Sequence, residues 1–220
     1  MIGVKLSCGA ALIVLGLILS GPPRQDRSRL LEPDAPEFLA PAPERAIVRL
    51  DTSVGIVDIE VVRKWAPRGA DRFVALVRHG YYDDNRFFRL RPGRWVQVGI
   101  NGDPAIARAW REKTFRDDPF VQSNTRGTVA FAFAVPNGRS TQVFVNTSDN
   151  SATHDKEPFT PFGQVVAGMA NVDRINAEHR EGPGGIRAGK QNPFFEGGNA
   201  WLLREFPRLD YIRRATLPTR

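Results

Sequence analysis

The stretch NRFFRLRPGRWVQVGINGDP, from residue 85 to residue 104, decides the fold of this chain. We interpret it as two short β-strands, over residues 87–91 and 95–100, because aromatic and aliphatic residues recur in both runs and a Pro-Gly pair separates them. Residues two apart in a strand share one face of the sheet. Trp95 therefore shares a face with Gln97, so an indole ring and an amide are expected side by side.

The rest of the chain predicts further strands and two helices. Residues 46–51 and 57–61 alternate between apolar and polar around a turn that contains glycine, which is typical of a β-hairpin. A helix is expected to begin at Pro67 and to end before Gly80, and a second, short helix is expected over residues 171–178. The remaining strands are expected at residues 127–133, 142–146 and 211–216. Many short strands with two helices favour a β-sandwich or a closed barrel.

Composition limits the function classes. The chain has 220 residues, of which 41% are hydrophobic and 25% charged, as in a soluble globular protein. Its formal net charge is +7, but the basic residues are scattered among acidic ones, so we expect no nucleic-acid partner. Cys8 is the only cysteine and the three histidines lie far apart, so we expect neither a disulfide within the chain nor a metal site. Nucleotide-binding and nucleophile motifs are missing, and no cofactor is expected.

The first 21 residues predict export. Lys5 precedes an uncharged apolar run from residue 6 to residue 19. Such a run is too short for a typical membrane span and is typical of a secretory signal peptide. The residues before Gly21 suit cleavage poorly, so residues 6–20 are alternatively expected to remain as a membrane anchor. Either outcome places the rest of the chain in the periplasm or cell envelope.

Residues 22–45 differ from the sequence on either side. They contain six prolines among charged residues, and we expect an extended, mobile linker that adds nothing to a core. The folded domain is therefore expected to cover residues 46–220. We expect it to fold alone and to be a monomer.

Several polar side chains in the predicted strands stand beside aromatic ones. Gln142 shares a face of its strand with Phe144, as Trp95 does with Gln97. Arg89 lies in the predicted strand that precedes the one with Trp95 and Gln97. A surface that joins a guanidinium, two amides, an indole and a phenyl ring could hold an apolar ring beside a hydrogen-bonded peptide carbonyl. Proline preceded by a carbonyl is such a ligand. From spacing alone, the aromatic residues are more simply explained as core residues.

Four blocks of the sequence, in order, resemble the cyclophilin family of peptidyl-prolyl cis-trans isomerases. They are residues 85–104, 126–132, 142–146 and 161–169. The resemblance extends from about residue 47 to residue 216. It implies a mainly β fold, a closed eight-stranded antiparallel β-barrel capped by two α-helices. It also implies an isomerase that acts on Xaa-Pro bonds of proline-containing polypeptides, here exported ones, and assists their folding.

The resemblance also implies roles for individual residues. Arg89 matches the catalytic arginine of the family, and Gln97 matches the glutamine that helps to orient it. Gln142 is implied to contact the peptide backbone of the substrate. Phe144 is implied to form the floor of the proline pocket and Trp95 its apolar wall. The strand implied to pair with the peptide contains Ala132, Phe133 and Ala134.

Several positions depart from the family pattern, among them the three that follow. Arg94 stands where a pocket phenylalanine is usual, His154 where a leucine closes the pocket, and Phe159 where many members have histidine. The methylene stem of Arg94 can still line the pocket while its charge reaches water. Because Arg89 and Gln97 are intact, we expect activity. The alternatives are a catalytically weak chaperone that binds proline-containing segments, or a scaffold of the same fold.

Overall fold

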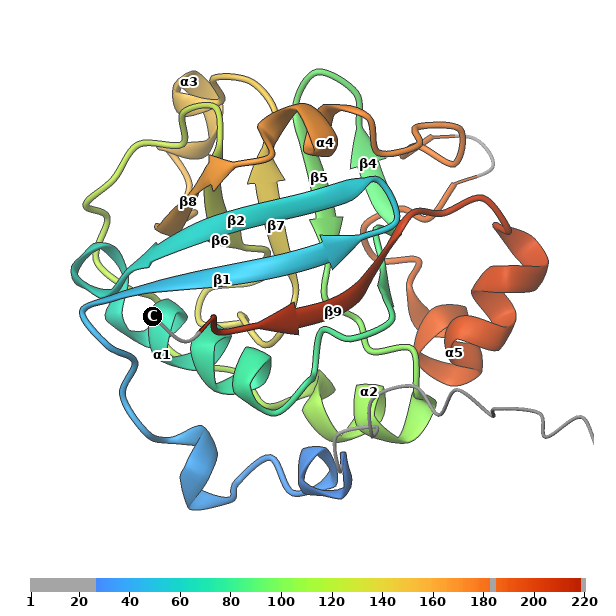
Figure 1. The fold of residues 1–220 in the computed structure, drawn as a ribbon, viewed down its shortest axis with the longest axis horizontal. Coiled ribbons are helices and arrows are strands. Elements are labelled where there is room, and N and C mark those ends of the chain that lie inside the picture. Colours follow the sequence, from blue (N-terminus) through green and yellow to red (C-terminus); the bar gives the residue numbers. More distant parts are fainter. Residues whose placement is uncertain (1–26, 183–184, 219–220) are drawn as a thin grey trace, which may run out of the picture.

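The computed structural model describes residues 27–182 and 185–218. Within them, nine antiparallel strands form one curled sheet in the order β3-β9-β1-β2-β8-β6-β7-β5-β4 (Figure 1). The strands are β1 (Arg45–Thr52), β2 (Gly55–Val62), β3 (Asn85–Arg86), β4 (Arg89–Arg91), β5 (Trp95–Val98), β6 (Thr128–Phe131), β7 (Val143–Asn146), β8 (Pro161–Ala167) and β9 (Tyr211–Thr216). The predicted mainly β, antiparallel, barrel-like fold is confirmed.

The two end strands of the sheet show how the barrel differs from the expected closed, eight-stranded one. In the described residues, β3 and β4 are the edges of a nine-stranded sheet and do not pair with each other. The chain instead passes from one edge to the other through Phe87 and Phe88, which are 4% and 0% exposed. Phe87 packs in the main core and Phe88 in a second, smaller core. The sheet is therefore open between β3 and β4, and two buried rings lie where the closed barrel would have a strand ladder.

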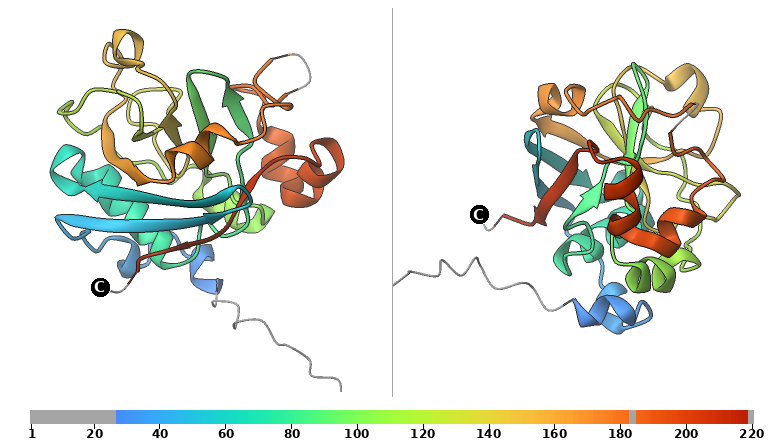
Figure 2. Two further views of the ribbon diagram at one scale, coloured as in Figure 1. Left: turned by 45° about the horizontal axis from the view of Figure 1, so that its top comes forward. Right: turned by 90° about the vertical axis from the view of Figure 1, so that its right-hand side faces the viewer.

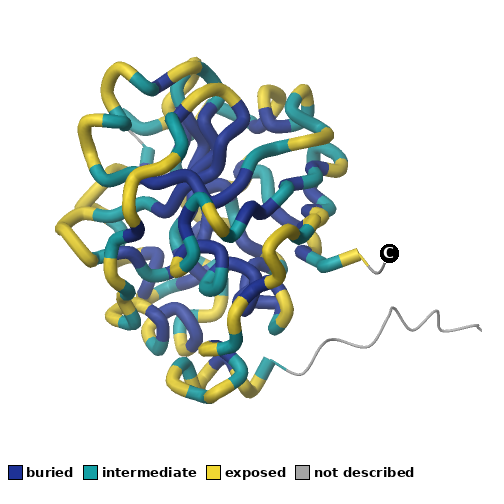
Figure 3. Tube along the Cα trace, turned by 90° about the vertical axis from the view of Figure 1, so that its left-hand side faces the viewer, coloured by how far each residue is buried: buried dark blue, intermediate teal, exposed yellow. Residues whose placement is uncertain are grey.

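The main core lies between the curled sheet and the helix α1 (Pro67–Arg78) (Figure 1). Proline occupies the first turn of α1, where its missing N–H costs nothing, and the helix ends before Gly80, as predicted. Phe73 and Val74 of α1 are each 1% exposed. Figure 3 shows the buried residues running through the middle of the molecule, with the exposed ones in the outer loops.

The described residues contain more helices than the two expected. Besides α1 they form α2 (Pro104–Arg111), α3 (Ser151–His154), α4 (Met169–Asp173) and α5 (Asn192–Glu205). The helix predicted over residues 171–178 is α4, which begins and ends earlier. It starts after Gly168, whose φ of 83° turns the chain into the helix. Beyond it, the Asn176 side chain accepts from the Glu178 N–H at 2.8 Å and forms a turn in place of another helical turn.

The second core attaches α2 and α5 to the barrel beside β4 and β5 (Figure 2). Phe194 of α5 is fully buried and its ring meets Phe88 edge-on at 5.4 Å. α5 is interrupted at Gly198 (φ 56°), where a Cβ atom would lie 2.2 Å from the Gly102 carbonyl oxygen. Only glycine fits this approach. The second core thereby fixes the start of α5 close to the site described below.

The segment before β1 packs on the domain, so the prediction of a mobile linker without core contacts is wrong for residues 27–45. Leu30 is fully buried and Phe38 is 5% exposed. The Trp110 indole N–H donates to the Leu30 carbonyl at 2.8 Å, and its ring meets Phe38 at 4.8 Å. The average composition of the segment is polar, but a few apolar residues suffice to cover this surface. The predicted signal at residues 1–21 lies outside the described residues, within which no helix is long and apolar enough to cross a membrane.

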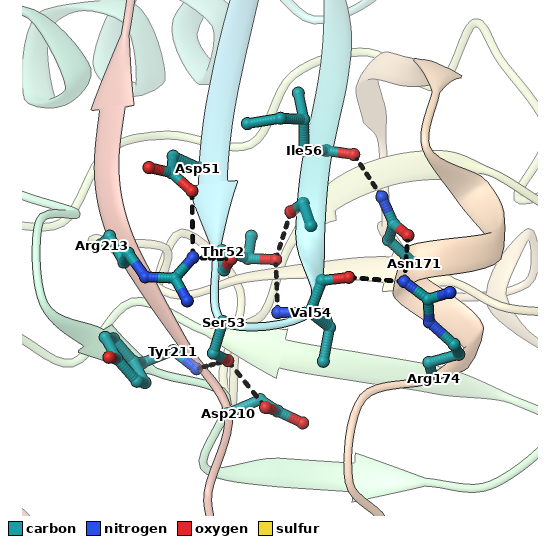
Figure 4. Close-up of polar contacts among 11 residues, drawn as sticks. Asp51, Thr52, Ser53, Val54, Ile56, Asn171, Arg174, Asp210, Tyr211 and Arg213 are labelled. Atoms are coloured by element: carbon teal, nitrogen blue, oxygen red, sulfur yellow. Dashed lines mark hydrogen bonds and ion pairs between the residues drawn. The ribbon is translucent and has the colours of Figure 1, made fainter.

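The β1–β2 hairpin predicted from sequence is present and tied to its surroundings (Figure 4). At its turn, Ser53 Oγ donates to Asp210 Oδ1 at 2.7 Å and accepts from the Tyr211 N–H at 2.9 Å. On the other side, Asn171 of α4 donates to the Ile56 carbonyl at 2.7 Å. The hairpin thus joins the C-terminal strand β9 to α4.

Candidate active site

Three polar side chains form a row across β4, β5 and the residue before β7. Arg89 in β4 is the strand partner of Gln97 in β5, and its Nη1 donates to Gln97 Oε1 at 2.8 Å. Gln97 Nε2 donates in turn to Gln142 Oε1 at 2.7 Å. We call Arg89, Gln97 and Gln142 the polar row. The structure thus brings together the three polar residues singled out from sequence.

Arg89 is held firmly but keeps a free donor. Its guanidinium carbon lies 4.4 Å from the centre of the Trp95 ring, and its side chain is 17% exposed. The Nε atom is buried and has no hydrogen-bond partner among the described residues. A buried donor without a partner is unfavourable. Because Nε is also closed to solvent, the donors that Arg89 can offer a ligand are the second N–H groups of Nη1 and Nη2.

A cluster of aromatic side chains, where the sequence predicts the proline pocket, adjoins the polar row. Phe144 follows Gln142 by two residues, is 4% exposed, and meets the rings of His154 and Phe159 at 5.4 Å each. Trp95, 8% exposed, packs in the same cluster. We call Trp95, Phe144, His154 and Phe159 the aromatic pocket. Such a cluster offers apolar contact to a small ring that is held beside a hydrogen-bonding group.

The polar row borders a groove with a volume of about 260 Å³. Ala132, Phe133 and Ala134 line the groove together with the polar row, as do residues of α2 and α5 and of the loop before α5. The Ala132 N–H already bonds the Gln142 carbonyl at 2.9 Å, so a peptide could pair only with other backbone groups of this segment. Phe133 is stacked between Phe159, at 4.5 Å, and the buried Arg139 guanidinium, also at 4.5 Å.

Arg94 does not line the pocket as a simple replacement for an apolar residue. Its Nη2 donates to Thr153 Oγ1 in α3 at 3.0 Å, and its carbonyl accepts from Asn150 Nδ2 at 2.7 Å. Arg94 thus connects the β4–β5 turn to α3 and carries its charge along the side of the aromatic pocket.

His154 is the titratable member of the pocket. Burial lowers its pKa from the ordinary value of 6.5, and the nearby Arg94 charge lowers it further, outweighing Asp155 and Glu157. The neutral ring is therefore the favoured form in the folded chain near neutral pH.

Stability should consequently fall in mild acid. Below about pH 6.5 the unfolded chain protonates His154 more readily than the folded chain does, so the free energy of unfolding decreases as the pH falls from the unfolded pKa to the lower folded pKa. We expect His154→Gln to lose less thermal stability than the wild type between about pH 7.5 and pH 5.5. His179→Gln, which changes a histidine packed on Phe206 away from the pocket, is the control. An equal loss in all three proteins would contradict the assigned role.

Sequence reasoning missed several residues at this site. Glu181 bonds Arg89, Gln191 bonds Gln142, and Arg139 lies beneath Phe133. Burial lowers the pKa of Arg139 to about 10. No local pattern could have pointed to Glu181 or Gln191, because they reach the row from far along the chain.

Among the described residues, no three His, Cys, Asp or Glu side chains lie close enough to hold a metal ion.

Comparisons with known proteins find relatives in sequence and in fold. The family model described as "Cyclophilin type peptidyl-prolyl cis-trans isomerase/CLD" matches residues 47–191. Peptidyl-prolyl cis-trans isomerase-like 3 of Rhizopus delemar is 34% identical over 131 residues, which are 55% of this chain and 75% of that protein. A peptidyl-prolyl cis-trans isomerase of Acinetobacter baylyi is 29% identical over 133 residues, 59% of this chain and 71% of that protein. A crystal structure of a Cryptosporidium parvum cyclophilin-type isomerase matches this structure with a TM-score of 0.58 at 17% identity. The match covers 80% of this chain and 99% of that chain, and it supports the fold.

Proposed function

Because this chain belongs to the cyclophilin-type peptidyl-prolyl cis-trans isomerase family, we propose that its groove isomerises Xaa-Pro bonds of exported polypeptides through Arg89. The observation that carries this proposal is the position of the Arg89 guanidinium. It lies between an aromatic pocket that suits a proline ring and a groove that suits the flanking peptide.

The reaction needs stabilisation of a twisted amide and no bond cleavage. Resonance gives the peptide bond a rotation barrier of ~18–20 kcal/mol, and an Xaa-Pro bond exchanges in tens to hundreds of seconds. As the bond twists, the proline nitrogen recovers a lone pair and becomes a hydrogen-bond acceptor. Arg89 can donate to this nitrogen, a contact that the planar amide does not offer. The contact therefore favours the transition state over both ground states.

Binding and orientation supply the rest of the rate gain. Phe144 and Trp95 would hold the proline ring while Gln142 contacts the peptide backbone. A gain of 10⁵ in rate corresponds to about 7 kcal/mol, of which one charge-assisted hydrogen bond supplies only a part. Holding the substrate in one orientation away from water contributes the remainder.

Arg94→Phe should raise catalytic efficiency. The new ring would widen the apolar wall and remove a charge beside the bound proline, for a gain of up to ~1–2 kcal/mol in binding. The ratio kcat/KM for an Ala-Pro peptide is the measurement. Thr153→Ala, which removes the partner of Arg94 together with the hydrogen bond of that hydroxyl to the Asn150 carbonyl, is the control for the lost hydrogen bond. Unchanged or lower efficiency in a folded Arg94→Phe protein would mean that the arginine has a role of its own.

A proline-binding chaperone of the same fold is the second candidate, and Arg94 is the observation that favours it. The two are separated by a coupled assay, in which a protease cleaves only the trans isomer of a short Ala-Pro peptide. The full chain is expected to accelerate the slow phase of cleavage. Binding of the peptide without acceleration would favour the chaperone.

Export is supported by the basic start and apolar run of residues 1–21. Residues 1–45 fused to a reporter enzyme that is active only outside the cytoplasm should give activity in a bacterial host. Val14→Arg, which interrupts the apolar run, should abolish it. An inactive wild-type fusion would overturn the export proposal and leave the isomerase proposal intact.

A further inference from the structure

The segment between α4 and α5 places an acidic side chain against the edge strand β4. The Glu181 N–H donates to the Leu90 carbonyl at 2.7 Å, which anchors residue 181 beside β4. From this position Glu181 Oε1 accepts a hydrogen bond from Arg89 Nη2 at 2.8 Å. The two side chains are only 23% and 17% exposed, so the ion pair is largely shielded from water.

The same part of the chain reaches the other end of the polar row. Gln142 Nε2 donates to Gln191 Oε1 at 3.1 Å. The hydrogen bonds therefore run without interruption from Glu181 through the polar row to Gln191. Both ends of the polar row are held by residues that lie between α4 and α5.

We propose that Glu181 is a positioning residue that fixes the Arg89 guanidinium for the proposed isomerase reaction, on which this inference rests. Gln97 holds Nη1 and Glu181 holds Nη2, while Trp95 packs on the plane of the group. With both Nη atoms anchored, the planar group cannot swing, and the second N–H of each Nη atom keeps a fixed direction. A donor held in place before the reaction loses no free energy to reorientation during it.

The surroundings of this ion pair distinguish it from an ordinary surface pair. Glu178 in the same segment also meets an arginine, Arg208, but those side chains are 41% and 67% exposed and neither touches the polar row. Exposed pairs of that kind contribute little. Glu178 is therefore a matched control for Glu181.

The first test compares turnover with binding in the full chain. Glu181→Ala should lower kcat for an Ala-Pro peptide about tenfold while its dissociation constant changes less than about twofold, because only the orientation of the guanidinium is lost. Glu181→Gln keeps an acceptor and should recover most of the turnover. Glu178→Ala should match the wild type. Unchanged or higher turnover in Glu181→Ala would overturn the proposal, since the pair would then be neutral or inhibitory.

The second test does not depend on activity. Restricted rotation should give separate NMR signals for the Nη protons of Arg89 in the wild type, and these should merge in Glu181→Ala and persist in Glu178→Ala. Identical Arg89 signals in the wild type and Glu181→Ala would overturn the positioning role. Absence of isomerase activity in the wild type would instead remove the proposed function, and the NMR comparison would still decide whether Glu181 fixes Arg89.

Discussion

Arg89→Ala is expected to lower turnover by roughly two orders of magnitude while the affinity for an Ala-Pro peptide changes little. The substitution removes the donor to the twisted proline nitrogen, a contact that exists only in the transition state. Losing such a contact, worth about 3 kcal/mol, reduces the rate by roughly a hundredfold. The binding surfaces around Phe144 and Gln142 remain, so the dissociation constant should be nearly unchanged.

Arg89→Lys is the informative companion. Lysine keeps the charge but lacks the planar fork that reaches Gln97, Glu181 and the substrate together. It should therefore lose most of the activity as well. Cis–trans exchange of the bound peptide and its dissociation constant are measured by NMR for the wild type and both variants. Retention of more than about a third of wild-type exchange by Arg89→Ala would show that the assignment is wrong.

Leu30→Ala is expected to be the most destabilising of the substitutions considered. Leu30 is fully buried in the main core, and truncation of a buried leucine costs about 2–5 kcal/mol. The neighbouring Leu31, 51% exposed, is the matched control, and Leu31→Ala should change stability by less than about 0.5 kcal/mol. Urea unfolding of the full chain measures both. Equal effects of the two substitutions would mean that the segment before β1 does not pack as described.

The same contacts change the expected boundary of the domain. A chain that begins at residue 46 would lose Leu30, Phe38 and Ala42 from the main core. The sequence does not reveal this packing, because these apolar residues lie in short, irregular groups among prolines and charges. Their partner, Trp110, is far along the chain and belongs to a helix that was not predicted.

The sheet was easier to predict than the elements around it. Alternation is a local pattern, and it located β1 and β2 to within a residue or two, while the strand-like composition of residues 211–216 located β9. α2 is not predicted, although Asp103 caps it and Pro104 occupies its first turn, because residues 101–104 enter the prediction only as the end of the sequence block 85–104. α5 was also missed, because its buried residues pack in the second core and do not recur in the sequence with a helical period.

The candidate site divides in the same way. Arg89, Gln97 and Gln142 meet through neighbouring strands, so a correct prediction of the strands already places them close together. Glu181 and Gln191 reach them from the segment between α4 and α5. Their contacts depend on how α5 docks, which only the three-dimensional structure shows. The prediction that Glu181 and Gln191 affect catalysis therefore comes from the structure and not from the sequence.

The most direct test of the central claim is cis–trans exchange of an Ala-Pro peptide in the presence of a catalytic amount of the full wild-type chain. Uncatalysed exchange takes tens to hundreds of seconds and gives no exchange cross-peaks on a sub-second NMR mixing time. If the polar row and the aromatic pocket act as proposed, cross-peaks between the cis and trans forms should appear on that mixing time and disappear with Arg89→Ala. A peptide that binds in the groove yet shows no cross-peaks with the folded wild-type chain would contradict the account.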